Sequence, residues 1–156
     1  MKKVILSVFV LSLTILVSCG DKSKKDNPKK ETVKEEVVKE EVAEVDPMKN
    51  KGIGPIKSVT LDAEVNQELA TKGKEIYEQM CSACHKTDKK FIGPAPKDIL
   101  DRRTPEWVMN MILNPDEMVK KDPIAKELLA EYLSPMSNQN LTEEQARAIL
   151  EYFRTL

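Results

Sequence analysis

The second half of the chain predicts helices and no strands, because helix start signals recur along it and no run of useful length alternates between apolar and polar residues. A first helix is expected over about residues 63–80. Thr104 as N-cap, with Pro105 at the first helical position, predicts a second helix that ends at Asn114-Pro115. This pattern indicates the all-α fold class.

Two more helices are predicted nearer the C-terminus. Asp122 and Pro123 repeat the order of a capping residue followed by a proline, ahead of a third helix. Thr142 and Gln145 then match the capping box, in which side chains and backbone N–H groups bond reciprocally. The last helix is expected to run from there to about residue 154.

The first twenty residues carry a different pattern, which is typical of export. Two lysines form a basic n-region, residues 4–17 form an apolar h-region, and Leu16-Val17-Ser18-Cys19 resembles the lipobox at which a bacterial lipoprotein is cleaved and diacylated. An uncleaved anchor is disfavoured, because a membrane-spanning helix needs ~20 apolar residues. We expect a signal peptide over residues 1–18 and a lipid anchor on Cys19.

Residues 19–61 are predicted to form the lipidated cysteine and a charged tether. From Gly20 onward the composition changes to Lys, Glu, Asp, Asn and Pro with scattered Val, and residues 33–37 and 38–42 repeat Val-Lys-Glu-Glu-Val in tandem. Such a segment buries too little apolar surface to offset chain entropy, which favours disorder. The roughly helical spacing of its valines leaves a transient helix as the alternative.

Overall charge and length add two limits. The net charge of −1 is close to neutral, which gives no case for nucleic-acid binding or for an electrostatic membrane patch. The remaining part of the chain, residues 62–156, is the expected folded domain. At roughly 95 residues it is small for an independent core.

The most specific chemical signal is Cys81-Ser82-Ala83-Cys84-His85, two thiols three positions apart followed at once by the only histidine of the chain. This is the attachment signature of c-type haem. Cys81 and Cys84 would add as thioethers across the two haem vinyl groups, and His85 would bind the iron as an axial ligand. One covalent haem c would also supply an apolar centre for the small domain, and its attachment requires the export that the signal peptide predicts.

Two other kinds of site use the same residue types. A structural zinc site needs four ligands, and the chain offers only Cys81, Cys84, His85 and Cys19, of which lipidation would remove Cys19. A redox dithiol is expected near a βαβ pattern, which the sequence lacks. A haem-free lipoprotein with a dithiol therefore stays as a disfavoured alternative.

With these motifs, residues 62–156 resemble the small bacterial class I cytochromes c, which are short electron carriers. Gly73 and Tyr77 stand eight and four residues before the first cysteine of the motif, as a glycine and an aromatic residue do in that family. The resemblance implies three to five helices wrapped around one covalent haem, with the first and last helices crossing closely. Leu150 and Phe153 are the expected counterparts in that crossing.

The same resemblance implies roles for residues around the haem. The carbonyl of Pro94 would accept a hydrogen bond from the second nitrogen of His85, which fixes the ring and strengthens its donation to iron. Met136 precedes the last helix much as the family's axial methionine does, and would be the sixth ligand, with Met118 or an open site as the alternatives. The indole of Trp107 would bond a haem propionate, with core filling as the alternative.

Basic residues outnumber acidic ones in the stretch that follows the haem motif. They form either a rim that steers an acidic redox partner or an ordinary solvated face. The basic residues are Lys86, Lys89, Lys90, Lys97, Arg102 and Arg103, against Asp88, Asp98 and Asp101.

Taken together, the motif and the resemblance imply an electron-transfer protein and not an enzyme. Low-spin His/Met iron would pass single electrons between redox partners, such as a quinol-oxidising complex and a terminal oxidase or reductase. The protein is expected to be a monomer, anchored to a bacterial membrane by lipid, with its haem domain on the periplasmic side. The alternative is a haem enzyme or a gas or redox sensor with a displaceable sixth ligand.

Overall fold

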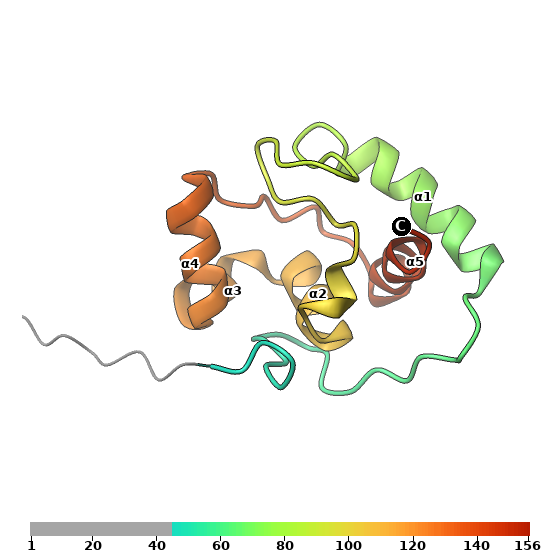
Figure 1. The fold of residues 1–156 in the computed structure, drawn as a ribbon, viewed down its shortest axis with the longest axis horizontal. Helices are drawn as coiled ribbons and strands as arrows, with labels where there is room; N and C mark the ends of the chain where they lie inside the picture. The colour runs from blue at the N-terminus through green and yellow to red at the C-terminus, as the bar shows by residue number, and fades with distance from the viewer. Residues whose placement is uncertain (1–44) are drawn as a thin grey trace, which may run out of the picture. The chain divides into compact units, whose positions relative to one another are not determined.

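The structure, a computed structural model, describes residues 45–156, which form helices and connecting segments around one cavity (Figure 1). No strand occurs in this part of the chain, so the all-α prediction is confirmed. No helix within the described residues is long and apolar enough to span a bilayer. The elements in order are α1 (Gln67–Met80), a 3₁₀ turn η1 (Ile99–Asp101), α2 (Pro105–Leu113), α3 (Pro115–Lys121), α4 (Pro123–Tyr132) and α5 (Glu143–Phe153).

Side-chain caps start four of these helices. The predicted caps Thr104, Asp122 and Thr142 accept hydrogen bonds from backbone N–H groups of α2, α4 and α5, and both bonds of the capping box are present on α5. Helix α1 begins later than expected because Asn66 caps it, accepting the N–H of Leu69 at 3.0 Å.

Helix α3 is a short element that the sequence analysis did not predict. The predicted end of α2 at Asn114-Pro115 is confirmed, and Pro115 is also the first residue of the next helix. Proline suits that position because its missing N–H would have no partner in the first turn. The chain therefore turns at Asn114 and continues as a helix of seven residues.

Helices α1 and α5 cross closely (Figure 1). A Cβ built on Gly73 would lie 1.9 Å from the carbonyl oxygen of Ala148, so this crossing has room only for glycine. The ring of Tyr77 lies 5.4 Å from that of Tyr152 and 5.8 Å from that of Phe153. The predicted crossing is confirmed, with Ala148 facing the glycine in place of the expected Leu150, which is fully buried in the core.

Residues 50–61, here called the strap, were predicted to belong to the tether but pack along α2. The buried side chain of Asn110 holds them from inside the fold: its Oδ1 accepts the N–H of Ile56 at 3.0 Å, and its Nδ2 donates to the carbonyls of Lys51 and Ile56, each at 2.9 Å. The N–H of Val59 donates to Glu106. The folded part of the chain thus begins about a dozen residues before the boundary predicted at residue 62.

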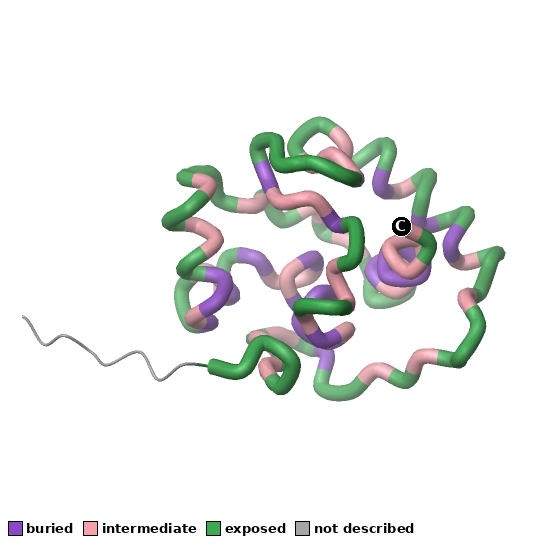
Figure 2. Tube along the Cα trace, viewed as in Figure 1, coloured by how far each residue is buried: buried purple, intermediate pink, exposed green. Residues whose placement is uncertain are grey.

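The carboxylate of Asp122 joins three elements inside the core. Its side chain is 2 % exposed and accepts hydrogen bonds from Nδ2 of Asn50 at 2.6 Å, from Nε1 of Trp107 at 3.0 Å and from the N–H of Ala125 at 2.9 Å. These bonds tie the strap to α2 and to the start of α4. Figure 2 shows buried positions, in purple, along both α2 and α5.

A second buried carboxylate, Glu151 of α5, fixes the chain that leads into α1. It is 1 % exposed and accepts bonds from Arg147 at 2.9 Å, from Arg154 at 2.8 Å and from the N–H of Asn66 at 3.2 Å. Burial alone would raise the pKa of Glu151, but the hydrogen bonds from Arg147, Asn66 and Arg154 outweigh it and hold the pKa below its ordinary value.

Glu151→Gln is expected to lower the free energy of unfolding by about 2 kcal/mol at pH 7, because a neutral amide leaves two half-buried guanidinium groups without their carboxylate. Because the folded pKa of Glu151 is depressed, its contribution is complete above the ordinary glutamate pKa of 4.5 and is lost as the pH falls through the lower folded value. Urea unfolding of parent and variant between pH 7 and pH 3 measures both effects.

The matched control is Glu144→Gln on the exposed side of α5, which should change stability by less than about 0.5 kcal/mol. An equal loss in both variants, or a Glu151→Gln difference that stays constant down to pH 3, would contradict the assigned role of Glu151.

Candidate functional site

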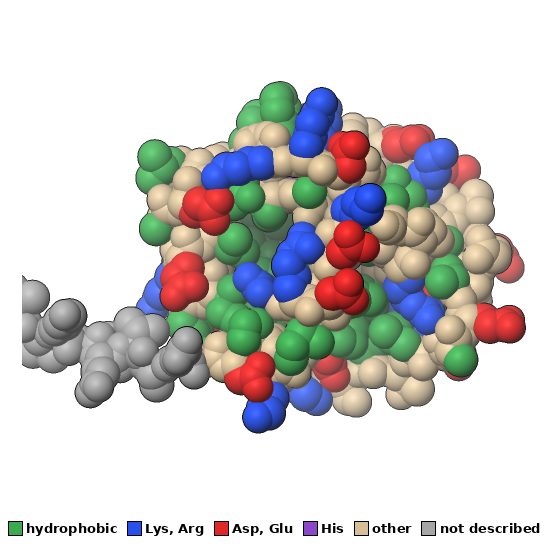
Figure 3. All heavy atoms as spheres, in the orientation of Figure 1, with side chains coloured by type: hydrophobic (Ala, Val, Ile, Leu, Met, Phe, Trp, Pro, Cys, Tyr) green, Lys and Arg blue, Asp and Glu red, His purple; other side chains and the backbone are tan. Residues whose placement is uncertain are grey.

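A cavity of about 260 Å³ lies between the residues that follow α1, helices α2 and α4, and the segment that leads to α5. Figure 3 shows the molecule hollowed near its middle, with hydrophobic side chains inside and Lys and Arg side chains close to the opening. The cavity brings together all six residues that the sequence analysis assigned to the haem and its iron: Cys81, Cys84, His85, Pro94, Trp107 and Met136.

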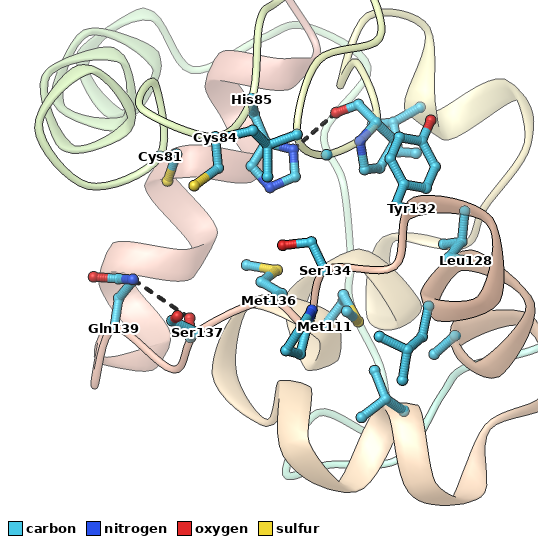
Figure 4. A pocket seen from close by; sticks show the side chains of 18 of the residues that line it. Cys81, Cys84, His85, Met111, Leu128, Tyr132, Ser134, Met136, Ser137 and Gln139 are labelled. Carbon is cyan, nitrogen blue, oxygen red and sulfur yellow. Dashed lines mark hydrogen bonds between the residues drawn. The ribbon is translucent and has the colours of Figure 1, made fainter. Parts of the chain in front are cut away.

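The Cys-x-x-Cys-His motif forms a turn that continues directly from α1. Cys81 is the C-cap of the helix, and its carbonyl accepts the N–H of Cys84 at 3.0 Å and that of His85 at 2.9 Å. This turn places both sulfur atoms and the imidazole at the cavity (Figure 4). The helix end therefore positions the whole motif.

The orientation of His85 is fixed by contacts on its far side. Its Nδ1 lies 2.8 Å from the carbonyl oxygen of Pro94, and since a carbonyl only accepts hydrogen bonds, Nδ1 carries the proton and the neutral ring keeps the lone pair on Nε2 for a metal. A Cβ on Gly93 would lie 2.4 Å from Cε1 of the imidazole, so the loop can pack this closely only with glycine. The hydroxyl of Tyr77 donates to the carbonyl of His85 at 2.8 Å.

The thiol of Cys81 lacks the lowered pKa that is typical of a redox dithiol. Both thiols of the motif are free, and burial, together with the neighbouring Cys84, raises the pKa of Cys81 to about 11. Reactive cysteines have lowered pKa values, because the thiolate is the nucleophile. Within residues 45–156 no group of three or more His, Cys, Asp and Glu side chains is arranged to hold a metal ion, so the zinc alternative gains no support.

The two candidate methionines occupy different places. Met136 lines the cavity, and Figure 4 shows its side chain pointing toward His85 from the opposite wall. Met118 lies outside the cavity, fully buried on α3, where its Sδ accepts the N–H of Ile53 at 2.9 Å. Met111 and Met80 also line the cavity, from α2 and from the end of α1. The geometry thus favours Met136 over its rival Met118.

Comparison with known proteins decides the family. Residues 70–156, more than half of the chain, match the model of the family described as Cytochrome c. The chain belongs to the cytochrome c family.

Solved structures of similar cytochromes agree with this assignment. Cytochrome c from Rhodothermus marinus is 45% identical over 65% of this chain and 88% of its own, with a TM-score of 0.64. An engineered form of that protein, Rma TDE, is 44% identical over 65% of this chain and 89% of its own, also with a TM-score of 0.64. A structure of the engineered form bound to a carbene intermediate is 45% identical over 65% and 88%, with a TM-score of 0.61. No curated protein matches the chain.

Cytochromes of this family bind covalent haem c, typically one per domain, and the residues at the cavity fit this group. Besides the two thiols and the histidine, Nε of Arg103 is buried and makes no hydrogen bond within the described residues. Burial and the neighbouring Arg102 lower the pKa of Arg103, so its guanidinium is in a site that favours a carboxylate partner. A haem propionate supplies such a carboxylate.

For Trp107 the structure favours core filling, the alternative to a bond with a haem propionate. The indole has a single N–H, which donates to Asp122 at 3.0 Å, so it is not free to bond a propionate. Trp107 instead forms an apolar wall of the cavity, with the guanidinium of Arg103 lying 5.3 Å from its ring centroid. The sequence analysis placed Arg103 only among the basic rim residues, because nothing local distinguishes it from its basic neighbours.

Gly93→Ala is expected to destabilise the haem-loaded protein by about 1–3 kcal/mol, because the added methyl group overlaps the His85 ring and forces the loop or the imidazole to shift. Denaturant unfolding measures the loss, and the visible absorption spectrum reports any change at the iron.

The matched control is Lys89→Ala, an exposed position in the same loop, which should leave both the stability and the spectrum unchanged. If Gly93→Ala behaves like Lys89→Ala, the packing of Gly93 on the imidazole is not what holds the ring.

Proposed function

We propose that the chain is a membrane-tethered mono-haem cytochrome c that carries single electrons between respiratory redox partners, with His85 and Met136 as axial ligands of low-spin iron. The observation that carries this proposal is the position of Met136, which faces His85 across the cavity that also holds Cys81 and Cys84. When bound, the haem supplies an iron that gains and loses one electron.

The chain's own residues tune that iron. The Pro94 carbonyl accepts a hydrogen bond from Nδ1 of His85. This bond fixes the ring and strengthens the donation of the Nε2 lone pair to iron. A thioether from Met136 favours the reduced state and raises the potential. His85 and Met136 would both hold the iron, so neither the imidazole nor the thioether would have to leave during electron transfer. The site therefore suits electron transfer better than substrate chemistry.

Partner docking involves fewer basic groups than the sequence alone suggested. Lys90 pairs with Glu131, the guanidinium of Arg102 donates to loop carbonyls, and Arg103 lines the cavity. Lys86, Lys89 and Lys97 are the rim lysines without an acidic partner within residues 45–156. They are suited to an acidic redox protein, such as a quinol-oxidising donor or a terminal oxidase or reductase as acceptor.

Membrane attachment is proposed through diacylated Cys19, with the haem domain on the periplasmic side. Cys19 and the lipobox lie outside the described residues, so this part rests on the sequence. Because the strap packs from residue 50 onward, the tether is shorter than predicted. Residues 20–49, as the coil that their composition predicts, would span roughly 30 Å r.m.s., at about 5.5 Å times the square root of the residue number.

The alternative of a displaceable sixth ligand is favoured by one observation. Within the described chain, residues 134–141 make hydrogen bonds only among themselves, so Met136 belongs to a segment with few anchors. A sensor or enzyme would exploit such a segment. An electron carrier must instead keep this segment in place, so that Met136 stays bound to the iron.

Met136→Ala is expected to keep its covalent haem, because both thioethers remain, but to bind carbon monoxide in the ferrous state. The affinity for carbon monoxide should rise on the order of a hundredfold or more over the parent. In the parent only the small fraction of molecules that has released Met136 can bind the gas, whereas every molecule of the variant can. Mass spectrometry of the denatured protein and titration followed by visible absorption measure the two results.

Two controls test the assignment of Met136. Met111→Ala removes another methionine from the cavity wall, and Met118→Ala removes the rival, at a cost of about 2–5 kcal/mol in stability. Both should retain the parent spectrum. A Met136→Ala protein that stays low-spin and indifferent to carbon monoxide would show that another residue ligates the iron.

Cys19→Ala is expected to release the protein from the membrane, because the acyl chains are attached to that sulfur. Fractionation of cells that express the full chain, followed by haem staining, measures the distribution. Ser18→Ala, which leaves the lipidated cysteine in place, is the control and should stay with the membrane. A Cys19→Ala protein that remains in the membrane fraction would refute the lipid anchor.

A further inference from the structure

The side chain of Lys90 bridges two segments that are far apart in the sequence. Its Nζ lies 2.5 Å from Oε1 of Glu131 and 4.3 Å from the ring centroid of Tyr132. One ammonium group thus makes an ion pair and a cation–π contact with adjacent residues in the last turn of α4. Lys90, Glu131 and Tyr132 are called the latch below.

The latch connects the part of the chain that carries His85 to the part that carries Met136. Lys90 lies in the loop that folds back on the histidine, three residues before Gly93, which packs against the imidazole. Tyr132 lies four residues before Met136. Among the residues that the structure describes, the Lys90–Glu131 bond is the only hydrogen bond between residues 81–104 and residues 123–141.

Apart from the packing of Met136 and Leu141 against the core, the Met136 segment has few contacts that hold it in place. Leu133, which ends α4, has a left-handed backbone with a φ of 54° and is 85 % exposed. Ser134 and Pro135 are exposed and make no hydrogen bond within residues 45–156. The position of Met136 therefore depends on the last turn of α4 and on the start of α5, and the latch is attached to the former.

The neighbouring lysines serve as internal comparisons. Lys89 is exposed and has no acidic or aromatic partner in the described part of the chain, while Lys86 lies over Phe91 of its own loop and so joins no second segment. The hydrogen bond to Glu131 raises the pKa of Lys90, so the ammonium stays charged at neutral pH. Only Lys90 among these lysines joins its own loop to α4.

We propose that Lys90 is a positioning residue, whose latch with Glu131 and Tyr132 holds the Met136 segment closed and thereby limits replacement of Met136 at the iron. This inference rests on the proposed His/Met ligation. Opening the latch lets the Met136 sulfur leave and a nitrogen of an added ligand take its place, with no change in oxidation state. Since an exposed ion pair is weakened by salt, the latch makes ligand exchange depend on ionic strength.

Imidazole binding to the ferric haem-loaded full chain, followed by visible absorption, measures how readily Met136 is replaced. Imidazole is predominantly uncharged at pH 8, so its binding is insensitive to the charge that a variant removes. Lys90→Met should bind it roughly fivefold more tightly than the parent, an effect of the size expected for an exposed ion pair with a cation–π contact. Raising the salt concentration should tighten binding to the parent and leave Lys90→Met unaffected.

Matched variants separate the latch from charge and from stability. Lys89→Met removes the same charge from the same loop and should bind imidazole like the parent. Lys90→Arg keeps the cation and should restore parent affinity within about twofold. Glu131→Gln should raise the imidazole affinity less than Lys90→Met does, because the contact between Lys90 and Tyr132 remains. The free energy of global unfolding of Lys90→Met should match that of Lys89→Met.

The outcomes distinguish the latch from the proposed function. The latch is overturned if Lys90→Met binds imidazole with the same affinity as the parent, or if Lys89→Met shows an equal increase in affinity. In either case the proposed His/Met ligation still holds, provided that Met136→Ala binds imidazole more tightly than the parent. If Met136→Ala binds imidazole no better than the parent, the His/Met ligation itself fails, and the latch fails with it.

Discussion

The contact between Gly73 and Ala148 is the constraint on which the rest of the fold depends. Because the first helix has no side chain at this point, it lies directly on the backbone of the last one. That position fixes where α1 ends, and the Cys-x-x-Cys-His turn begins at the next residue. The opposite wall of the cavity, with Met136, is built by the segment that leads into α5. One helix crossing thus positions both His85 and Met136, the proposed axial ligands.

Polar groups inside the core complete this frame, and each joins segments that are distant in sequence. Asp122 ties the strap to α2 and α4, Asn110 holds the strap along α2, and Glu151 fixes the chain before α1. All three are buried and satisfied, so each rigidifies the fold instead of destabilising it. By contrast, the exposed Lys90 makes the one hydrogen bond, within the described chain, between residues 81–104 and residues 123–141.

The features that the sequence predicted well are those that depend only on residues close together in the chain. The caps at Thr104 and Thr142 and the end of the first helix at Met80 are local features, and the structure has them where they were expected. The strap was assigned to the tether because its own residues are polar and irregular, and its partner Asn110 is fifty residues and more away. The hydrogen bond from Trp107 to Asp122 could not be predicted from the sequence either, because only the packed fold brings the two groups together.

The visible absorption spectrum of the unmodified haem-loaded protein, in ferric and ferrous states and with carbon monoxide added, tests the central claim most directly. A closed His/Met electron carrier gives low-spin spectra in both oxidation states and no change with carbon monoxide. A high-spin spectrum, or rapid formation of a carbon monoxide adduct at the ferrous iron, would contradict the account and identify a ligand-binding cytochrome.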